Sequence, residues 1–354
     1  MTVRTQLKRT LLRSLRASGV FRLVAGSGWR TQRLLILCYH GTSLEDEHQW
    51  RPSLYIAPAV LEQRLEFLRR GRYSVLPLGE ALKRLQSGTL PPRSVVLTFD
   101  DGTYDFYGQA FPLLRQYNFP ATVYQTTYYV QHQLPVFNLI CSYMLWKRRG
   151  DVLPRGQAIG LPGVMDLRDE PSRHRIVRAL IESAEREHLS GDQKDGLAAR
   201  LAELLGLDYA ALKVKRILQL MNRSELEQVA QQGIDLQLHT HRHRAPEDET
   251  QFRREIDDNR TVLKGIAQPL EHFCYPSGLY RPEMLAWLQA EGVRSATTCD
   301  AGLAEPDSGQ LLLPRFVDNQ NRDSIDFESW ITGVGELLAV RRAAPQVYVP
   351  GDGA

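Results

Sequence analysis

The chain contains no run of about 18 apolar residues, the length that a membrane-spanning helix requires. It also has only four cysteines, at positions 38, 141, 274 and 299, and none of them forms a C-x-x-C pair. With 354 residues the chain can bury a large core, so it does not need disulfide bonds for stability. The four thiols are therefore expected to lie buried in a reducing compartment, with a Cys274–Cys299 bridge as the alternative.

Acidic residues are missing from positions 1–33, which carry eight lysines and arginines. Because the whole chain has a net charge of only +3, the remainder is mildly acidic, and nothing in it predicts a nucleic-acid groove. Leu7, Leu11 and Leu15 recur at helical spacing with basic residues between them. Residues 1–24 are thus expected to form a basic amphipathic helix, which either contacts an anionic membrane surface peripherally or docks on the protein's own acidic body.

A secretory apolar region and an A-x-A-like cleavage site are also absent from this N-terminal segment. The composition therefore favours a cytoplasmic protein, located at the inner face of the membrane if residues 1–24 bind lipid. The aromatic, apolar and charged content is that of an ordinary globular protein.

What the chain does contain is an alternation of strand-like and helix-like segments. Short apolar runs predict strands, and longer segments with apolar residues at helical spacing predict helices. The expected strands are 34–40, 73–78, 94–99, 120–127, 234–239, 272–276, 295–299 and 311–316, and the expected helices are 57–71, 79–88, 106–119 and 281–292. Such alternation predicts an α/β fold with a parallel sheet, either open or closed into a barrel.

The alternation lapses between about Tyr128 and Leu220, where amphipathic helices occur without strands. We interpret this stretch as a helical insertion in a barrel domain that spans residues 34–330, followed by a C-terminal tail at 331–354. The insertion is expected either to cap the barrel mouth and narrow a substrate cleft or to be a passive surface addition.

Polar residues stand where the expected strands end. Asp100 and Asp101 follow one strand, and His239, His241 and His243 follow another. Because the carboxyl ends of parallel strands lie at one face of the sheet, these side chains are expected to meet there.

Each group also has a simpler interpretation. An Asp-Asp-Gly sequence is often only a turn, and a histidine cluster is often only a solvated surface. Together, however, carboxylates and imidazoles are the ligands of a first-row metal site, with three protein ligands and an open position for water. One aspartate then binds the metal while its neighbour reaches that water, and the cation offsets the repulsion between the carboxylates. His40 by itself is better interpreted as a packed core histidine.

The segments LTFDDG (97–102), HTHRH (239–243) and FCYPSG (273–278) resemble motifs of the polysaccharide deacetylase family, whose founding members include the rhizobial nodulation chitooligosaccharide deacetylases. CYHG (38–41) and LPRF (313–316) resemble pieces of one branch of it. The resemblance implies a distorted (β/α) barrel and a metal-dependent hydrolase that removes N-acetyl, sometimes O-acetyl, groups from sugars.

Carried over by position, the resemblance makes Asp100 the general base. Asp101, His239 and His243 become the ligands of a divalent metal, most often Zn²⁺. The backbone N–H of Tyr275 would help hold the oxyanion.

The chain departs from the family pattern at three places. Cys274 stands where many members have an arginine, the usual Asp-Trp motif is not evident, and no histidine follows His272 to supply the late Leu-x-His motif. The branch with an early Tyr-His pair implies that His40 replaces that late histidine as general acid.

The expected substrate is an N-acetylated polysaccharide, oligosaccharide or lipid-linked sugar. A competing interpretation is a non-catalytic glycan-binding module on a decayed deacetylase fold, although such a module would not need Asp100 as a base. A third interpretation is a metal-dependent hydrolase of another bond, such as a deformylase of a lipid-linked sugar or a phosphoesterase. A two-metal phosphoesterase would require more carboxylates than this site offers.

Overall fold

The computed structural model describes residues 3–154, 156–161 and 163–339 of the chain. At its centre is an eight-stranded sheet with the order β11-β10-β9-β6-β5-β1-β12, in which β4 also pairs with β5. All of these pairings are parallel. The strands are β1 (Leu35–Tyr39), β4 (Ser74–Val75), β5 (Ser94–Phe99), β6 (Thr122–Gln125), β9 (Asp235–Leu238), β10 (His272–Cys274), β11 (Ser295–Thr297) and β12 (Phe316–Val317).

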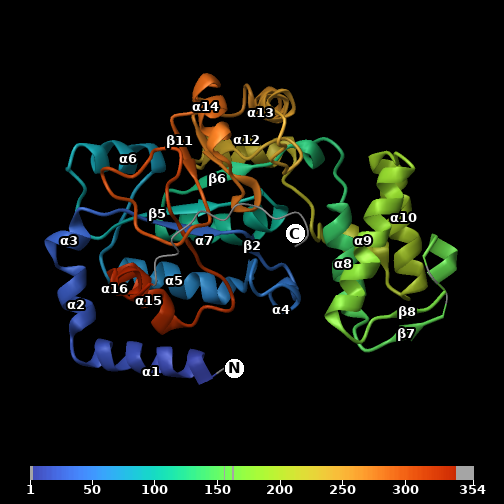
Figure 1. Cartoon of the computed structure of the whole chain (residues 1–354), viewed down its shortest axis with the longest axis horizontal. Coiled ribbons are helices and arrows are strands. Elements are labelled where there is room, and N and C mark those ends of the chain that lie inside the picture. Colours follow the sequence, from blue (N-terminus) through green and yellow to red (C-terminus); the bar gives the residue numbers. More distant parts are fainter. Residues whose placement is uncertain (1–2, 155, 162, 340–354) are drawn as a thin grey trace.

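The two edges of the sheet curl toward each other. Leu313, three residues before β12, forms a parallel bridge with Thr297 of β11, which is the opposite edge strand. The sheet is therefore a distorted barrel surrounded by helices, and the predicted α/β fold is confirmed (Figure 1).

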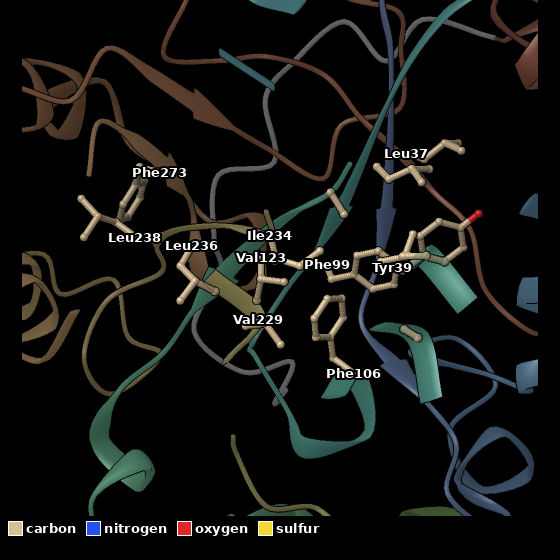
Figure 2. Close-up of a cluster of buried hydrophobic side chains, with 14 of the residues drawn as sticks. Leu37, Tyr39, Phe99, Phe106, Val123, Val229, Ile234, Leu236, Leu238 and Phe273 are labelled. Atoms are coloured by element: carbon tan, nitrogen blue, oxygen red, sulfur yellow. The ribbon is translucent and has the colours of Figure 1, made fainter. Parts of the chain in front are cut away.

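Alternate residues of each strand face opposite sides of the sheet. Leu37, Phe99, Val123, Leu236 and Phe273 point outward and pack in the main hydrophobic cluster beneath the surrounding helices (Figure 2). These helices are α5 (Pro58–Arg70), α7 (Phe111–Tyr117), α12 (Arg223–Gln231), α13 (Glu249–Leu263) and α14 (Pro282–Ala290). Because both faces of strands such as β1 and β5 are buried, the strands appear in the sequence as short apolar runs, and this is why they could be predicted.

The intervening residues point into the barrel. Ile36, Val96 and Tyr124 form a second cluster with Leu78 and Leu82 of helix α6 (Leu78–Gln86). Every second residue of a strand points to the same side, so Cys38 and His40 point inward like Ile36 of β1, and Thr98 and Asp100 point inward like Val96 of β5. This alternation brings chemically active side chains to the carboxyl end of the barrel interior.

The predicted insertion contains helices α8 (Phe137–Lys147), α9 (Glu170–Arg186), α10 (Gly191–Leu204) and α11 (Tyr209–Val214) and a short antiparallel pair, β7 (Val152–Leu153) and β8 (Met165–Asp166). It has its own hydrophobic cluster and lies to one side of the barrel, drawn in green in Figure 1. That cluster includes Trp50 of α4 (Glu47–Trp50) and Tyr55 of β3 (Tyr55–Ile56). Strand β3 pairs with β2 (Gly41–Thr42), directly after β1, so the insertion packs on the side to which the strands direct their carboxyl ends.

The N-terminal segment forms α1 (Val3–Ala17), α2 (Val20–Ala25) and α3 (Gly28–Thr31). Helix α1 lies on α15 (Ser324–Thr332), where its basic side chains meet acidic ones. The ion pairs are Lys8–Asp326 at 2.6 Å, Arg9–Asp323 at 2.5 Å and Arg16–Glu328 at 2.9 Å. Helix α1 thus docks on the protein's own acidic residues, the second of the two arrangements expected for it.

The predicted C-terminal tail is too long. Its first residue, Ile331, is buried within α15, and α16 (Val334–Leu338) follows with Val334 buried, so the folded part extends beyond residue 330. The rest of that tail, residues 340–354, lies outside the described residues. Within the described ranges, no helix combines the length and the apolar character needed to cross a membrane.

Adjacent leucines of α1 provide a matched test of its docking. Leu12 is 1% exposed in the small cluster with Phe21 and Ile325, whereas Leu11 is 49% exposed. Leu12→Ala should lower the free energy of unfolding by about 2 kcal/mol, because it removes buried methyl groups. Leu11→Ala should change it by less than about 0.5 kcal/mol. Urea unfolding of the two variants measures this, and equal effects would contradict the docking.

Candidate active site

Three predicted metal ligands converge at the carboxyl end of the barrel. Asp101 Oδ1 lies 3.3 Å from Nε2 of His239 and 3.3 Å from Nε2 of His243. One ligand atom from each residue lies within 4.8 Å of the other two. Asp101 follows β5 and the histidines follow β9, so two strand ends separated by more than a hundred residues build one cluster.

The backbone at this cluster adopts left-handed conformations that L-residues rarely occupy. Asp101, Thr240 and His243 have φ values of 70°, 60° and 55°. Such conformations cost about 1–3 kcal/mol each and persist only where the surroundings impose them. Gly102 also has φ 70°, and a Cβ atom there would lie 1.8 Å from Gln125 Oε1, so this turn requires glycine. The Asp-Asp-Gly motif is therefore a strained turn that directs Asp101 toward the histidines.

The residues of this cluster fit a divalent metal. His239 Nδ1 donates a hydrogen bond to the Cys274 carbonyl oxygen at 2.8 Å, which directs Nε2 toward Asp101. Asp101 Oδ1 is buried and forms no hydrogen bond, although two imidazole nitrogens face it. Three such donor atoms around a shared point are the ligand set of a catalytic zinc-type site.

The charge of the Asp101 carboxylate is maintained by the same neighbours. Burial alone would raise its pKa, but the His243 and His239 imidazoles hold the pKa well below its usual range. An ionised carboxylate is the form that binds a metal.

The adjacent Asp100 points into the barrel and is fully paired. Arg315 donates from its two terminal nitrogens to Oδ1 and Oδ2 of Asp100, each at 2.7 Å. The Cys38 and Cys274 thiols donate to Oδ2 at 3.5 and 3.4 Å. Burial would raise the pKa of Asp100, but Arg315 outweighs burial and holds it well below the usual range. Asp100 is therefore an ionised carboxylate beside the ligand cluster.

Arg315 is a site residue that the sequence analysis did not single out, although it lies in the LPRF segment. It is fully buried, and its side chain lies 3.1 Å from the sulfur of Cys274, the residue that replaces the family's usual arginine. The guanidinium of Arg315 thus lies close to the position at which other family members carry an arginine, although Arg315 comes from another part of the chain.

His40 lies at the rim of the same group rather than in the hydrophobic core. Its Nε2 is 3.8 Å from Asp100 Oδ2, and its side chain is 17% exposed. Burial lowers the pKa of His40, and the nearby Asp100 and Asp101 offset this only in part. A lowered pKa favours the neutral imidazole at neutral pH, so His40 has to take up a proton before it can donate one.

The structure contradicts the expectation for Tyr275. Its backbone N–H donates to the Thr297 carbonyl at 3.2 Å, and its hydroxyl donates to the Leu311 carbonyl at 3.1 Å. Because Tyr275 is fully buried and both donors are used within the barrel, it has no N–H for an oxyanion. Two residues later, Ser277 is exposed with φ 56° within the short turn Pro276–Gly278.

The remaining sequence-derived expectations concern His241 and the cysteines. His241 lies outside the ligand cluster, with Nδ1 2.9 Å from Thr127 Oγ1. All four cysteines are free thiols, so the Cys274–Cys299 bridge is not formed.

Known proteins resemble the chain in sequence. A family model described as polysaccharide deacetylase matches residues 87–166 and 208–296, so the resemblance found in the motifs is confirmed. The chain is 29% identical over 100 residues to a poly-beta-1,6-N-acetyl-D-glucosamine N-deacetylase of Escherichia coli K12, covering 28% of this chain and 15% of that protein. It is 33% identical over 69 residues to the protein of the same name from Staphylococcus epidermidis, covering 20% and 24%. The chain thus spans only a small part of these relatives.

Solved structures share the fold. The Streptococcus pyogenes deacetylase PplD in complex with acetate aligns with a TM-score of 0.54 and 20% identity, covering 82% of this chain and 93% of that one. IcaB from Ammonifex degensii aligns with a TM-score of 0.52 and 17% identity, covering 85% and 97%. These likenesses support the distorted barrel that the strand order shows.

The buried pair of Arg315 and Asp100 predicts a non-additive effect on stability. Arg315→Met leaves Asp100 as an unpaired buried charge, so the free energy of unfolding should fall by about 3–5 kcal/mol. Adding Asp100→Asn removes that charge, and the double variant should be more stable than Arg315→Met alone. Chemical denaturation measures both.

Arg294→Met is the control for this pair, because Arg294 is 71% exposed in its ion pair with Glu271 and should contribute less than about 1 kcal/mol. A double variant less stable than Arg315→Met would show that the two residues do not act as a pair.

Proposed function

From the premise that the chain matches the polysaccharide deacetylase family in its motifs and its fold, we propose that it is a metal-dependent hydrolase that removes N-acetyl groups from a glycan. The observation that carries this proposal is the convergence of Asp101, His239 and His243 beside the ionised Asp100. The relatives named as poly-beta-1,6-N-acetyl-D-glucosamine N-deacetylases support an acetylated amino-sugar polymer as substrate, with a lipid-linked saccharide as the alternative carrier and O-acetyl groups as the alternative bond.

Amide hydrolysis is slow because water is a weak nucleophile and an amine is a poor leaving group. A divalent metal, for which we propose Zn²⁺, would lower the pKa of a bound water to about 7 and polarise the acetyl carbonyl. Asp100 takes the proton of the attacking water, and Arg315 keeps that carboxylate ionised and fixed in orientation.

Two further groups complete the proposed mechanism. His40 delivers a proton to the departing amine from the side of the site where its Nε2 faces Asp100. In place of Tyr275, the N–H of the exposed Ser277 in the following turn is proposed as the backbone donor to the oxyanion. The products are acetate and a glycan with a free amine.

A non-catalytic glycan-binding module is the competing proposal. The burial of Asp100 against a dedicated arginine counts against it, since an ionised carboxylate in the barrel interior is costly and a binding surface would not require it. A deformylase would use the same residues, so the acyl group released distinguishes it. For a phosphoesterase the cluster offers only one carboxylate among its three ligand atoms.

The insertion is proposed to narrow the substrate cleft. Arg244, the residue after His243, lies 3.6 Å from Glu185 of α9, so the ligand loop and the insertion approach each other. Met221, the residue directly after the insertion, bonds to the Asp-Asp-Gly turn, since its N–H donates to the Gly102 carbonyl at 3.0 Å.

Metal content and turnover separate the proposed roles. Purified protein should bind about one Zn²⁺ per chain, and Asp101→Ala, His239→Ala and His243→Ala should each lose most of it. Asp100→Asn should retain the metal but release acetate from an acetylated glycan roughly 10²–10⁴ times more slowly, because only the proton acceptor is removed. Metal analysis and an acetate assay measure these effects.

The assay has clear contrary outcomes. Full metal retention in the three ligand variants would refute the ligand assignment, and wild-type turnover in Asp100→Asn would refute the base. Release of formate rather than acetate would favour the deformylase, and binding of glycan without any release would favour the binding module.

We further propose peripheral membrane contact of a cytoplasmic protein through α1. Although three of its basic residues pair with acidic residues of α15 and its N-cap, Leu7 and Leu11 remain exposed on the outer face of α1. If so, the protein should cosediment with anionic vesicles at low salt and be released by high salt. The double variant Leu7→Ser and Leu11→Ser should lose this binding while keeping its fold. Wild-type protein that stays in the supernatant at low salt would rule out the contact.

A further inference from the structure

Helix α13 lies behind the metal-ligand loop and was not expected from any motif. One face of it is formed by Glu255, Asp258 and Asn259, and we call these three residues the α13 clamp. Phe252 and Ile256 of α13 pack against the outward-facing residues of the barrel in the main hydrophobic cluster. The helix is therefore anchored to the sheet independently of the loop.

Asn259 is fully buried and uses its whole amide to join two strand ends. Its Oδ1 accepts the N–H of His239 at 3.1 Å, and its Nδ2 donates to the Gln125 carbonyl and to Thr127 Oγ1, each at 2.9 Å. Gln125 ends β6 and His239 follows β9, so this side chain fixes the position from which a ligand leaves its strand.

A chain of hydrogen bonds leads from Asn259 through Thr127 to His241. Thr127 Oγ1 accepts from Asn259 and also forms a hydrogen bond with His241 Nδ1, at 2.9 Å. The backbone N–H groups of Thr127 and Tyr128 donate to the His241 carbonyl at 3.2 and 2.8 Å. These bonds hold the middle of the ligand loop against the segment that follows β6.

The two acidic residues of the clamp hold the other side of the loop. The His241 N–H donates to the Glu255 backbone carbonyl at 3.0 Å, and the Arg242 N–H donates to Glu255 Oε2 at 2.7 Å. The Arg242 guanidinium bonds Glu255 Oε1 at 2.9 Å and Asp258 Oδ2 at 3.2 Å. The two loop residues with left-handed φ are Thr240 and His243. Thr240 lies between the hydrogen-bonded residues His239 and His241, and His243 directly follows Arg242.

A strained loop needs an external restraint to keep its shape. We infer that the α13 clamp, and Asn259 above all, is a positioning device that holds His239 and His243 in ligand geometry before a divalent cation arrives. Without the clamp the loop relaxes, and part of the free energy of cation binding is used to order the ligands. The affinity of the site for the cation therefore falls. The inference rests on the proposed metal site but adds residues that touch neither metal nor substrate.

The test compares Asn259→Ala with Gln237→Ala in the full chain. Gln237 is also a buried amide that links β9 to β10, since it donates to the Pro269 carbonyl at 2.9 Å and accepts the His272 N–H at 2.8 Å. It stands two residues before His239, but its side-chain bonds go to Asp235, Pro269, Glu271 and His272 and not to the ligand loop. Both variants should lower the free energy of unfolding. Only Asn259→Ala should weaken Zn²⁺ binding, by roughly 10–100-fold as for other residues that support metal ligands. Chelator competition measures the Kd.

Glu255→Ala is the second variant, with Asp257→Ala, an exposed neighbour on α13, as its control. Glu255→Ala should also weaken Zn²⁺ binding, and Asp257→Ala should not. If folded Asn259→Ala and Glu255→Ala bind Zn²⁺ as tightly as the wild type, or if Gln237→Ala weakens binding equally, the clamp is not a positioning device. If the wild-type protein binds no Zn²⁺, it is the proposed metal site that fails.

Discussion

The bidentate ion pair between Arg315 and Asp100 connects the architecture of the barrel to its chemistry. The same guanidinium that holds the carboxylate also donates to Thr98 Oγ1 at 3.1 Å and to the Thr298 carbonyl at 2.8 Å. It therefore links β5 at the centre of the sheet to the residues that follow the edge strand β11. A positive and a negative charge buried together are costly to desolvate, and the surrounding hydrogen bonds compensate for that cost only in this one arrangement. The pair thus helps to specify how the sheet curls.

Much of the fold could be predicted because it follows from local patterns. Outward-facing apolar residues such as Leu37, Phe99 and Leu236 alternate with inward-facing ones, and the parallel order of strands follows from the helices between them. The grouping of Asp101 with the histidines could be predicted for a related reason, because parallel strands direct their carboxyl ends to one face whatever their separation in sequence.

What could not be predicted depends on contacts between distant segments. A lone arginine after Pro314 has no pattern to mark it as buried. Whether the Tyr275 N–H is free depends on its pairing with Thr297 of the next strand, which no spacing encodes. Helix α13 is dominated by charged residues, with few apolar positions to mark its packing. The partners of α1 lie about three hundred residues away, so the sequence could not decide between a membrane and α15 as its binding surface.

The two ends of the helical insertion meet. The Val136 N–H donates to the Leu218 carbonyl at 2.8 Å, and β6 pairs directly with β9 over four residues, although the whole insertion lies between these strands in sequence. The barrel is therefore continuous without the insertion, and the insertion is attached through a narrow neck. A unit attached in this way can change in length or composition without shifting the strands that carry the ligands. Evolution could therefore alter what reaches this end of the barrel by exchanging this one module while leaving the cluster of Asp101, His239 and His243 unchanged.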